Sequence, residues 1–244
     1  GSEMCIRDSC KTERECVIES IAMAKAKGYR DLEEVIANGE TLKAGDKVYA
    51  NNMGKTVAFF LIGKQPLENG MNILGAHVDS PRLDIKQNPL YEDNELALLD
   101  THYYGGIKKY QWVTLPLALH GVFAKKDGTV VNVNIGEDDN DPVVGISDLL
   151  VHLSADQLSK KANVVIEGED LNVTVGSIPV EGEEKDAVKK NILRILKEKY
   201  DVEEDDFVSA EIEVVPAGKA RDYGLDRSMV MGCLLYTSPS PRDR

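Results

Sequence analysis

Cysteine, histidine and tryptophan are scarce in this chain, and it has no long hydrophobic run. Of its 244 residues, four are cysteine, four are histidine and one is tryptophan. The cysteines form no C-x-x-C pair and three of them crowd the N-terminal end, so the sequence indicates neither a disulfide framework nor a thiolate metal site. The longest uncharged apolar stretch, residues 110–124, is interrupted by polar residues and falls short of the ~18 apolar residues that a membrane span needs.

Positive charge is also in short supply. The chain has 29 Lys and Arg against 42 Asp and Glu, a formal net charge of -13. This charge repels nucleic-acid backbones and anionic membrane surfaces, so we expect neither as a partner. No secretory signal pattern is visible in residues 1–30, which predicts a cytoplasmic protein. With 42% hydrophobic residues, the composition is that of a globular chain, not of a disordered or fibrous one.

The two ends of the chain differ from the sequence between them. Residues 1–9 and 233–244 have no helical or strand period, and they resemble translated sequencing-adapter sequence. We interpret both as non-native segments, with ordinary frayed termini as the alternative. The fold is therefore predicted from residues 10–232.

Before Pro89 the sequence predicts helices and short apolar strands. Thr12 and Glu15 form a capping box that predicts a helix ending near Gly28. A hairpin is predicted around N-N-M-G, with its second arm buried because that arm is apolar on both faces. A further buried strand is predicted to end at H-V-D-S-P. The predicted elements after the first helix are a helix at residues 32–37 and strands at 47–50, 56–62 and 71–76.

After Pro89 the pattern becomes β-rich. Asp186 is placed to cap a helix that runs to Tyr200. In the last predicted strand, Glu211 and Glu213 alternate with apolar residues, which predicts that both face water. The predicted strands are residues 96–99, 113–123, 129–135 and 208–214. Two acidic runs, residues 137–141 and 203–206, lack the spacing of a calcium loop and are interpreted as solvated loops.

His77 and Asp79 are the residues most suited to chemistry. They lie two apart, so in an extended segment both side chains point to one side, where the imidazole can bind a metal and the carboxylate can orient it. A loop histidine hydrogen-bonded to its neighbour is the alternative. Ser80 lacks the glycine-flanked turn of a nucleophile, and Gly105-Gly106 lacks the G-K-[ST] of a phosphate loop.

The remaining histidines carry weaker signals. His120 lies in an apolar run and is predicted to be a hydrogen-bonded core residue. His152 follows three apolar residues and has the same interpretation. For His102 no role beyond structure is indicated.

Four strings resemble the aspartyl aminopeptidase family, in its bacterial aminopeptidase I branch. They are K-T-E-R-E, G-A-H-V-D-S-P-R-L-D, T-H-Y-Y-G-G-I-K-K-Y-Q-W and V-P-A-G-K-A-R-D-Y-G-L-D-R-S, and they occur in the family's order. The resemblance implies a dizinc exopeptidase that removes the N-terminal residue of peptides. It also implies an α/β zinc-exopeptidase-type catalytic domain, incomplete here, interrupted by an inserted β-rich dimerisation domain that makes a homo-oligomer.

The resemblance assigns roles to three residues. His77 matches the family's first zinc ligand, and Asp79 matches the catalytic aspartate behind it. His152, in L-V-H-L, resembles an insert-domain histidine that reaches a neighbouring subunit's active site and binds substrate. The implied domains are residues 10–89 for the start of the catalytic domain, 90–225 for the insert and 226–232 for the return to the catalytic domain.

The departure from the family lies after Gly232. There the family's sequence continues into the zinc-bridging carboxylate, the general base and the remaining ligands, whereas this chain continues into the segment interpreted as non-native. Asp243 has no matching context and is not assigned a role. We therefore expect a fragment that binds zinc weakly and has no peptidase activity alone, because a catalytic zinc needs about three protein ligands. The alternative function is a non-catalytic oligomerisation module.

Substrate preference is not set by this sequence. The family's name implies acidic N-terminal residues, yet the net charge of -13 repels acidic peptides at distances beyond the Debye length of about 8 Å. Such a preference would need a local cation that the sequence does not identify.

Overall fold

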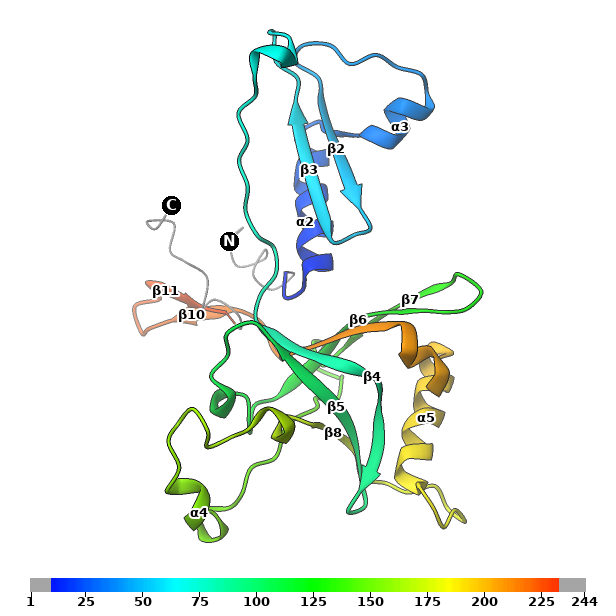
Figure 1. Cartoon of the computed structure of the whole chain (residues 1–244), viewed down its shortest axis with the longest axis vertical. Helices are drawn as coiled ribbons and strands as arrows, with labels where there is room; N and C mark the ends of the chain where they lie inside the picture. Colours follow the sequence, from blue (N-terminus) through cyan, green and yellow to red (C-terminus); the bar gives the residue numbers. More distant parts are fainter. Residues whose placement is uncertain (1–9, 233–244) are drawn as a thin grey trace. The chain divides into compact units, whose positions relative to one another are not determined.

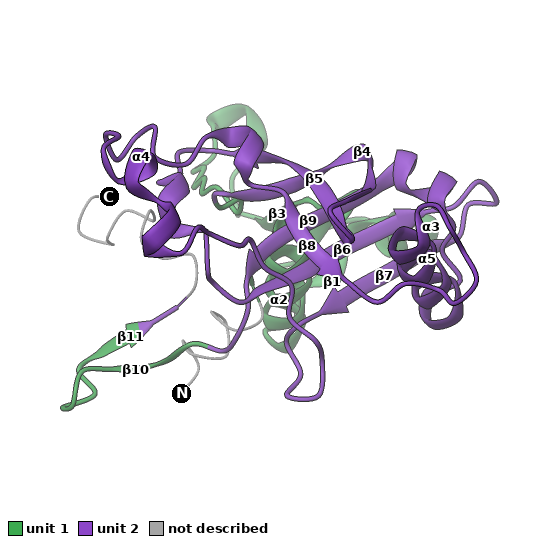
Figure 2. Cartoon of the chain, turned by 90° about the horizontal axis from the view of Figure 1, so that it is seen from below, with its two compact units in different colours: residues 1–80, 220–230 green, residues 81–219, 231–244 purple. Residues whose placement is uncertain are grey.

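The computed structural model describes residues 10–232 and divides the chain into two compact units (Figure 2). The first unit comprises Gly1–Ser80 and Ala220–Val230, and the second comprises Pro81–Lys219 and Met231–Arg244. The segments interpreted as non-native, residues 1–9 and 233–244, lie outside the described residues. No helix within residues 10–232 has the length and apolar character to cross a membrane.

The first unit begins with the two predicted helices. Helix α2 (Glu13–Ala26) starts at Thr12, whose hydroxyl accepts a hydrogen bond from the Glu15 amide at 3.3 Å, while the Glu15 carboxylate accepts one from the Thr12 amide at 3.1 Å. The predicted capping box is therefore confirmed. Helix α3 (Leu32–Ala37) starts at Asp31, whose carboxylate accepts from the Glu33 amide at 2.9 Å.

A three-stranded sheet packs with these helices. Its strands are β1 (Arg30–Asp31), β2 (Lys47–Asn52) and β3 (Thr56–Leu61), in the order β1-β2-β3, with β2 and β3 forming the predicted hairpin. The expected burial of the second arm is wrong. Phe59 is 40% exposed and Leu61 is 64% exposed, because β3 lies at the sheet edge and α2 packs on only part of it.

The strand predicted at residues 71–76 does not form. After the short 3-10 helix η1 (Leu67–Asn69), the chain runs without regular structure to β4, and Ile73 and Leu74 are 80% and 99% exposed. A strand needs a neighbour for its backbone hydrogen bonds, and within residues 10–232 none pairs with this segment. A two-stranded ribbon, β10 (Arg221–Tyr223) and β11 (Met229–Met231), follows much later in the chain.

The second unit is built on a six-stranded antiparallel sheet (Figure 1). The strand order is β7-β6-β9-β4-β5-β8, so β9, the last of these six strands in the sequence, pairs with both β6 and β4. The strands are β4 (Arg82–Asp93), β5 (Leu96–Tyr104), β6 (Leu117–Ala124), β7 (Val130–Ile135), β8 (Val173–Gly176) and β9 (Ala210–Pro216). Strand β6 begins after Pro116, later than the predicted residue 113, since proline cannot donate a ladder hydrogen bond.

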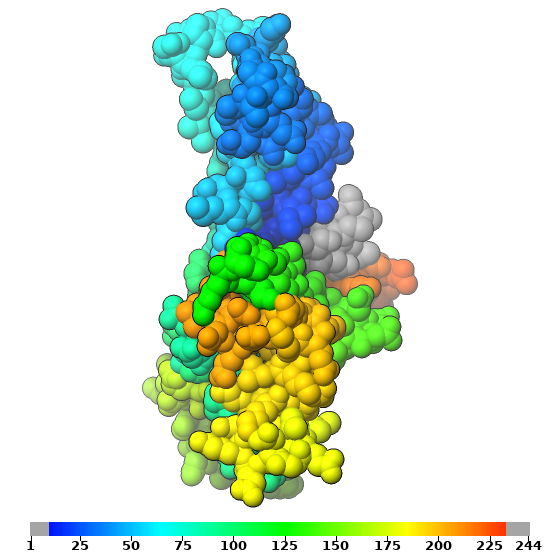
Figure 3. All heavy atoms as spheres, turned by 90° about the vertical axis from the view of Figure 1, so that its right-hand side faces the viewer, coloured from blue at the N-terminus to red at the C-terminus, as the bar shows by residue number. Residues whose placement is uncertain are grey.

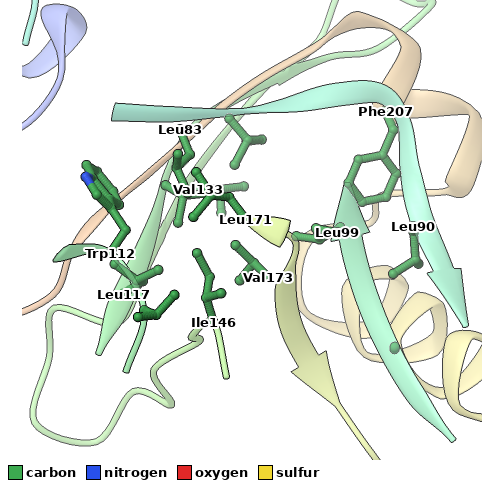
Figure 4. Close-up of a cluster of buried hydrophobic side chains, with 14 of the residues drawn as sticks. Leu83, Leu90, Leu99, Trp112, Leu117, Val133, Ile146, Leu171, Val173 and Phe207 are labelled. Carbon is green, nitrogen blue, oxygen red and sulfur yellow. The ribbon is translucent and has the colours of Figure 1, made fainter. Parts of the chain in front are cut away.

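One face of this sheet and helix α5 (Ala187–Tyr200) enclose the core. Leu83 and Leu117 are fully buried there (Figure 4). Val214 is fully buried as well, and Phe123 packs edge-on against Phe207 at 5.1 Å between ring centroids. The outer surface of α5 faces solvent, beside the segment that carries the 3-10 helix η5 (Glu204–Ser209) (Figure 3). The other short helices are η2 (Lys109–Gln111), η3 (Val151–Leu153), α4 (Ala155–Leu158) and η4 (Gly168–Asp170).

The predictions for Asp186, residues 203–206 and Glu213 are wrong. Asp186 does not cap α5 with its side chain; the Glu92 carboxylate on β4 does, accepting from the Val188 and Lys189 amides at 2.9 and 3.0 Å. Residues 203–206 form the start of η5, where Glu203 and Asp206 make a capping box, and not a loop. Glu213 does not face water but is 3% exposed, because the Arg82 guanidinium lies 3.2 Å from its carboxylate.

Candidate functional site

The H-x-D pair predicted to carry chemistry lies in the first unit, on the irregular segment before β4. The His77 Nδ1 atom is 3.0 Å from the Asp79 carbonyl oxygen and 3.3 Å from the Asp79 carboxylate. The two side chains are 64% and 38% exposed, so the imidazole is neither buried among apolar groups nor shut off from solvent. The predicted proximity of the two groups is confirmed, although the segment is not the strand end that the sequence suggested.

This geometry determines which imidazole nitrogen is available. Both Asp79 oxygens near Nδ1 are acceptors, so the hydrogen-bond network assigns the ring proton to Nδ1. The Nε2 atom then carries the lone pair, and no hydrogen bond to it forms within the described part of the chain. A histidine held in this way, with its second nitrogen donating to a carboxylate or carbonyl, is typical of metal ligands.

A complete metal site is not formed by residues 10–232. In that range, no group of three or more His, Cys, Asp or Glu side chains is arranged to hold a metal ion. The His77 Nε2 atom is a suitable zinc donor, but a catalytic zinc takes three protein ligands and a structural one takes four. The described residues therefore supply one suitable zinc ligand, His77, and not a complete site.

His152 lies in the second unit, on η3. It is exposed, and its apolar neighbours on the same turn are exposed as well, with Leu150 at 70% and Leu153 at 71%. The prediction that His152 is a packed core residue is wrong, because the apolar run around it lies on the surface. His77 and Asp79 are neighbours on one segment of the first unit, whereas His152 belongs to the other unit.

His120 behaves as predicted. It is 3% exposed, and its Nε2 atom is 2.9 Å from a Glu137 carboxylate oxygen. The ring is therefore hydrogen-bonded inside the second unit and has a structural role. His102 is exposed at the end of β5, where its ring stacks on Tyr103 at 5.7 Å between centroids.

The two described cysteines do not form a metal site. Both have free thiols, and the Cys16 thiol donates a long hydrogen bond of 3.6 Å to the Cys10 carbonyl oxygen. The hydrogen bond with Cys10, together with burial, raises the pKa of Cys16 above its ordinary value of 9.0. A thiol with a raised pKa is a poor metal ligand.

A buried polar cluster in the second unit was not identified from the sequence. Arg82 is 6% exposed; its Nε atom is 2.8 Å from the Asp84 carboxylate and 3.2 Å from that of Glu213, and its guanidinium stacks on the Tyr104 ring at 4.3 Å. The signal that could have indicated it is the R-x-D spacing, which places Arg82 and Asp84 on one face of β4. The cluster fixes the start of β4, a few residues after His77 and Asp79 in the sequence.

Comparison with known proteins identifies the family of this chain. A family model described as "Aminopeptidase I zinc metalloprotease (M18)" matches residues 7–235, nearly the whole chain. The chain belongs to this M18 family of zinc metallopeptidases, and the sequence-based recognition of an aminopeptidase I relative is confirmed.

Individual relatives agree. A "Probable M18 family aminopeptidase 1" from Clostridium acetobutylicum is 72% identical over 225 residues, which is 92% of this chain and 48% of that protein. The crystal structure of the M18 aminopeptidase from Thermotoga maritima superposes with a TM-score of 0.87 at 46% identity, over 94% of this chain and 49% of that one. Aminopeptidase I from Clostridium acetobutylicum superposes with a TM-score of 0.83 at 69% identity, over 92% and 50%.

These matches bear on the predicted fold and cofactor. The mixed α/β architecture resembles the M18 aminopeptidase structures, and the family is one of zinc enzymes. The chain spans about half the length of the curated relatives that it matches.

Proposed function

We propose that this chain is the zinc-anchoring and assembly half of a metallo-aminopeptidase that releases the N-terminal residue of peptides in the cytoplasm. The observation that carries the proposal is the His77–Asp79 geometry, in which a carbonyl and a carboxylate hold Nδ1 and leave Nε2 available. Membership of a zinc aminopeptidase family supports it. The other ligands and the general base would come from the part of the relatives that this chain does not span.

The residues of this chain would act by positioning. His77 would hold one of two zinc ions through Nε2, and Asp79 would keep the ring in the Nδ1-protonated form while strengthening it as a ligand. Zinc, when bound, polarises a peptide carbonyl and makes water more acidic. His152, exposed on η3, would bind the peptide, from a neighbouring copy of the chain. The chain alone would bind zinc weakly and would not cleave peptides, since one histidine is far from a complete ligand set.

A chimaera tests the catalytic proposal. Residues 10–232 are joined to the second half of the Clostridium acetobutylicum relative, and release of an N-terminal residue from short peptides is measured with and without zinc. We expect zinc-dependent activity that falls by orders of magnitude in His77→Ala. Asp79→Asn should weaken zinc binding by about 10- to 100-fold, as loss of an outer-shell partner does.

The matched control is His102→Ala, which removes an exposed histidine from the second unit. It should keep both zinc content and activity. Full activity in His77→Ala would rule out the assignment of His77 as a zinc ligand. If chimaeras that fold and bind two zinc ions all lack peptidase activity, the peptidase function is ruled out.

The second part of the proposal concerns residues 90–225, which we take to be an inserted domain for self-association. The compact second unit, Pro81–Lys219, covers most of this range, although its limits lie closer to the N-terminus. Support comes from exposed apolar side chains around η3, including Leu150 at 70%, Val151 at 66% and Leu153 at 71%, since contiguous exposed apolar groups mark protein contacts. In sedimentation equilibrium at micromolar concentration, the chain should form oligomers, and a monomer would contradict self-association. A non-catalytic oligomerisation module, the alternative function, would also form oligomers, so this test does not distinguish it from the aminopeptidase.

A further inference from the structure

We propose that β7 is a dimerisation edge, at which two copies of this chain pair their β7 strands antiparallel about a two-fold axis. The inference rests on the proposed self-association and assigns it one surface, separate from the exposed apolar residues around η3. It concerns only the second unit.

The first observation is that β7 lies at an open edge of the sheet. In the order β7-β6-β9-β4-β5-β8, its only strand neighbour among the described residues is β6. One side of the strand therefore presents backbone groups without a ladder partner. Proteins that stay monomeric protect such an edge with charged side chains, proline, a bulge or a covering element.

None of those side-chain protections is present in β7. Its sequence is V-V-N-V-N-I, with no charge and no proline, in a chain of which 29% is charged. Its pairing with β6 runs without a register shift from Ala124↔Val130 to Leu119↔Ile135, so no bulge twists the edge away. Val130 is 55% exposed. A regular, uncharged, β-branched edge of this kind is a template for another strand.

The second observation is an apolar cavity of about 400 Å³ that β7 helps to line. Val133 and Ile135 contribute from β7, Leu119 and Phe123 from β6, and Ile192 from α5. No charged side chain lines the cavity. Its rim is apolar and solvent-exposed at Val143 (53%), Ile178 (70%) and Ile195 (42%), which suits a protein partner better than a small ligand enclosed on all sides.

A second copy is the occupant that fits the open edge of β7. Antiparallel pairing of two identical strands has a two-fold axis perpendicular to the sheet, and this symmetry closes the assembly at a dimer for that edge. The same symmetry keeps the apolar faces of both sheets on one side, so the two cavities would lie on the same face of the joined sheet. Because β7 has no charged residue, the pairing places no like charges directly opposite each other.

The test adds charge to the edge of the chain as it exists. Asn132 and Asn134 are exposed on β7, so Asn132→Lys/Asn134→Lys should fold normally while placing like charges opposite each other in the dimer. Sedimentation equilibrium should show a wild-type dimer whose dissociation constant rises at least tenfold in the variant. The control, Asn38→Lys/Asn69→Lys, adds the same charge at exposed positions of the first unit and should leave the constant within twofold of wild type.

Hydrogen exchange gives an independent result. Amides of β7 should exchange at least tenfold more slowly in the dimer than in the dilute monomer. If the lysine variant dimerises like wild type, or β7 amides exchange equally in both states, the inference is overturned while self-association through another surface stands. A chain that is monomeric throughout overturns both. Neither measurement uses zinc or peptide hydrolysis, so failure of the catalytic proposal is recognised separately.

Discussion

The buried ion pair between Arg82 and Glu213 shows how a side chain on a neighbouring strand can make an expected solvent-facing residue a buried one. The alternation in β9 correctly identifies Glu211 and Glu213 as one face, but it assumes that this face meets water. Instead, Arg82 on β4 lies beside Glu213, which is 3% exposed. Alternation predicts which residues share a face, whereas the burial of that face depends on what packs against it.

Removing the arginine should be costly. Arg82→Met leaves the Glu213 carboxylate buried without this cation, and we expect the second unit to lose about 3–5 kcal/mol of stability. Trp112, the only tryptophan in the chain and 8% exposed, reports unfolding of this unit by fluorescence in urea. Arg82→Met/Glu213→Leu should regain much of the loss; a double variant no more stable than the single one would argue against the pair as the cause.

Asp201 provides a prediction about pH. Hydrogen bonds from the Lys125 and Lys197 amino groups, at 2.7 and 2.5 Å, lower its pKa from the ordinary 3.8 to about 2. A carboxyl with a lowered pKa stabilises the folded state above its unfolded pKa, and this contribution is lost as the pH falls from about 3.8 to about 2. The urea midpoint of the wild type should therefore drop more steeply across that window than that of Asp201→Asn.

Asparagine suits this position because Asp201 has a φ of 54°, in the left-handed region that asparagine tolerates. Asp139→Asn, in an exposed loop of the same unit, is the matched control and should follow the wild-type curve. Parallel curves for Asp201→Asn and wild type would exclude the proposed linkage.

The contact between His77 and Asp79 could be predicted from the sequence because the two residues are close neighbours in the chain. His77 and Asp79 are two residues apart, and their contact needs only an extended backbone. Their setting was not predictable from spacing, because the strand expected before them needs a partner that residues 10–232 do not supply.

At the scale of elements, helix starts divide into local and distant cases. Helix α2 is capped by residues within its own first turn, Thr12 and Glu15, so the sequence pattern suffices. Helix α5 is capped by Glu92, 96 residues before Val188, and no local pattern reveals it. Asp186 fills the capping position, but it adopts a φ of 53° and makes no capping hydrogen bond.

The stability of α5 should therefore depend on Glu92. Glu92→Ala removes the acceptor of two amide hydrogen bonds and a negative charge at the positive end of the helix dipole, which should cost about 1–2 kcal/mol. Glu92→Gln keeps an acceptor and should cost less. Asp186→Gly should be neutral or stabilising, because glycine adopts a positive φ without strain. A larger loss in Asp186→Gly than in Glu92→Ala, by urea unfolding, would contradict this assignment.

At the scale of the whole molecule, the β-rich character of the region after Pro89 was predicted correctly, whereas the burial of the N-terminal apolar segments was not. Apolar runs such as residues 71–76 predict burial only if a covering element exists, and sequence pattern cannot say where that element comes from. In the chain described here, Ile73 and Leu74 are exposed and their segment makes no strand pairing.

That segment should be the first site of proteolysis. Thermolysin cuts before large apolar residues in extended, unpaired backbone, so limited digestion should cleave within residues 71–76 before the core of the second unit. Mass spectrometry of the fragments identifies the cut. Ile73→Asp/Leu74→Asp should delay it, whereas Leu153→Asp on η3 should not. First cleavage within residues 149–158 would contradict this prediction, because it would show that the segment around η3 is more accessible to the protease than residues 71–76.

The strand order of the second unit has a consequence for biosynthesis. Strand β9 occupies the middle of the sheet between β6 and β4, yet it is the last of the six to leave the ribosome. Until residues 210–216 emerge, no strand links β6 to β4. The nascent chain can then form only the pair β7-β6 and the group β4-β5-β8, each with an unpaired inner edge. Folding of this unit must therefore wait for the end of its own translation, and a pause before that point prolongs the period in which those edges can pair with the wrong strand.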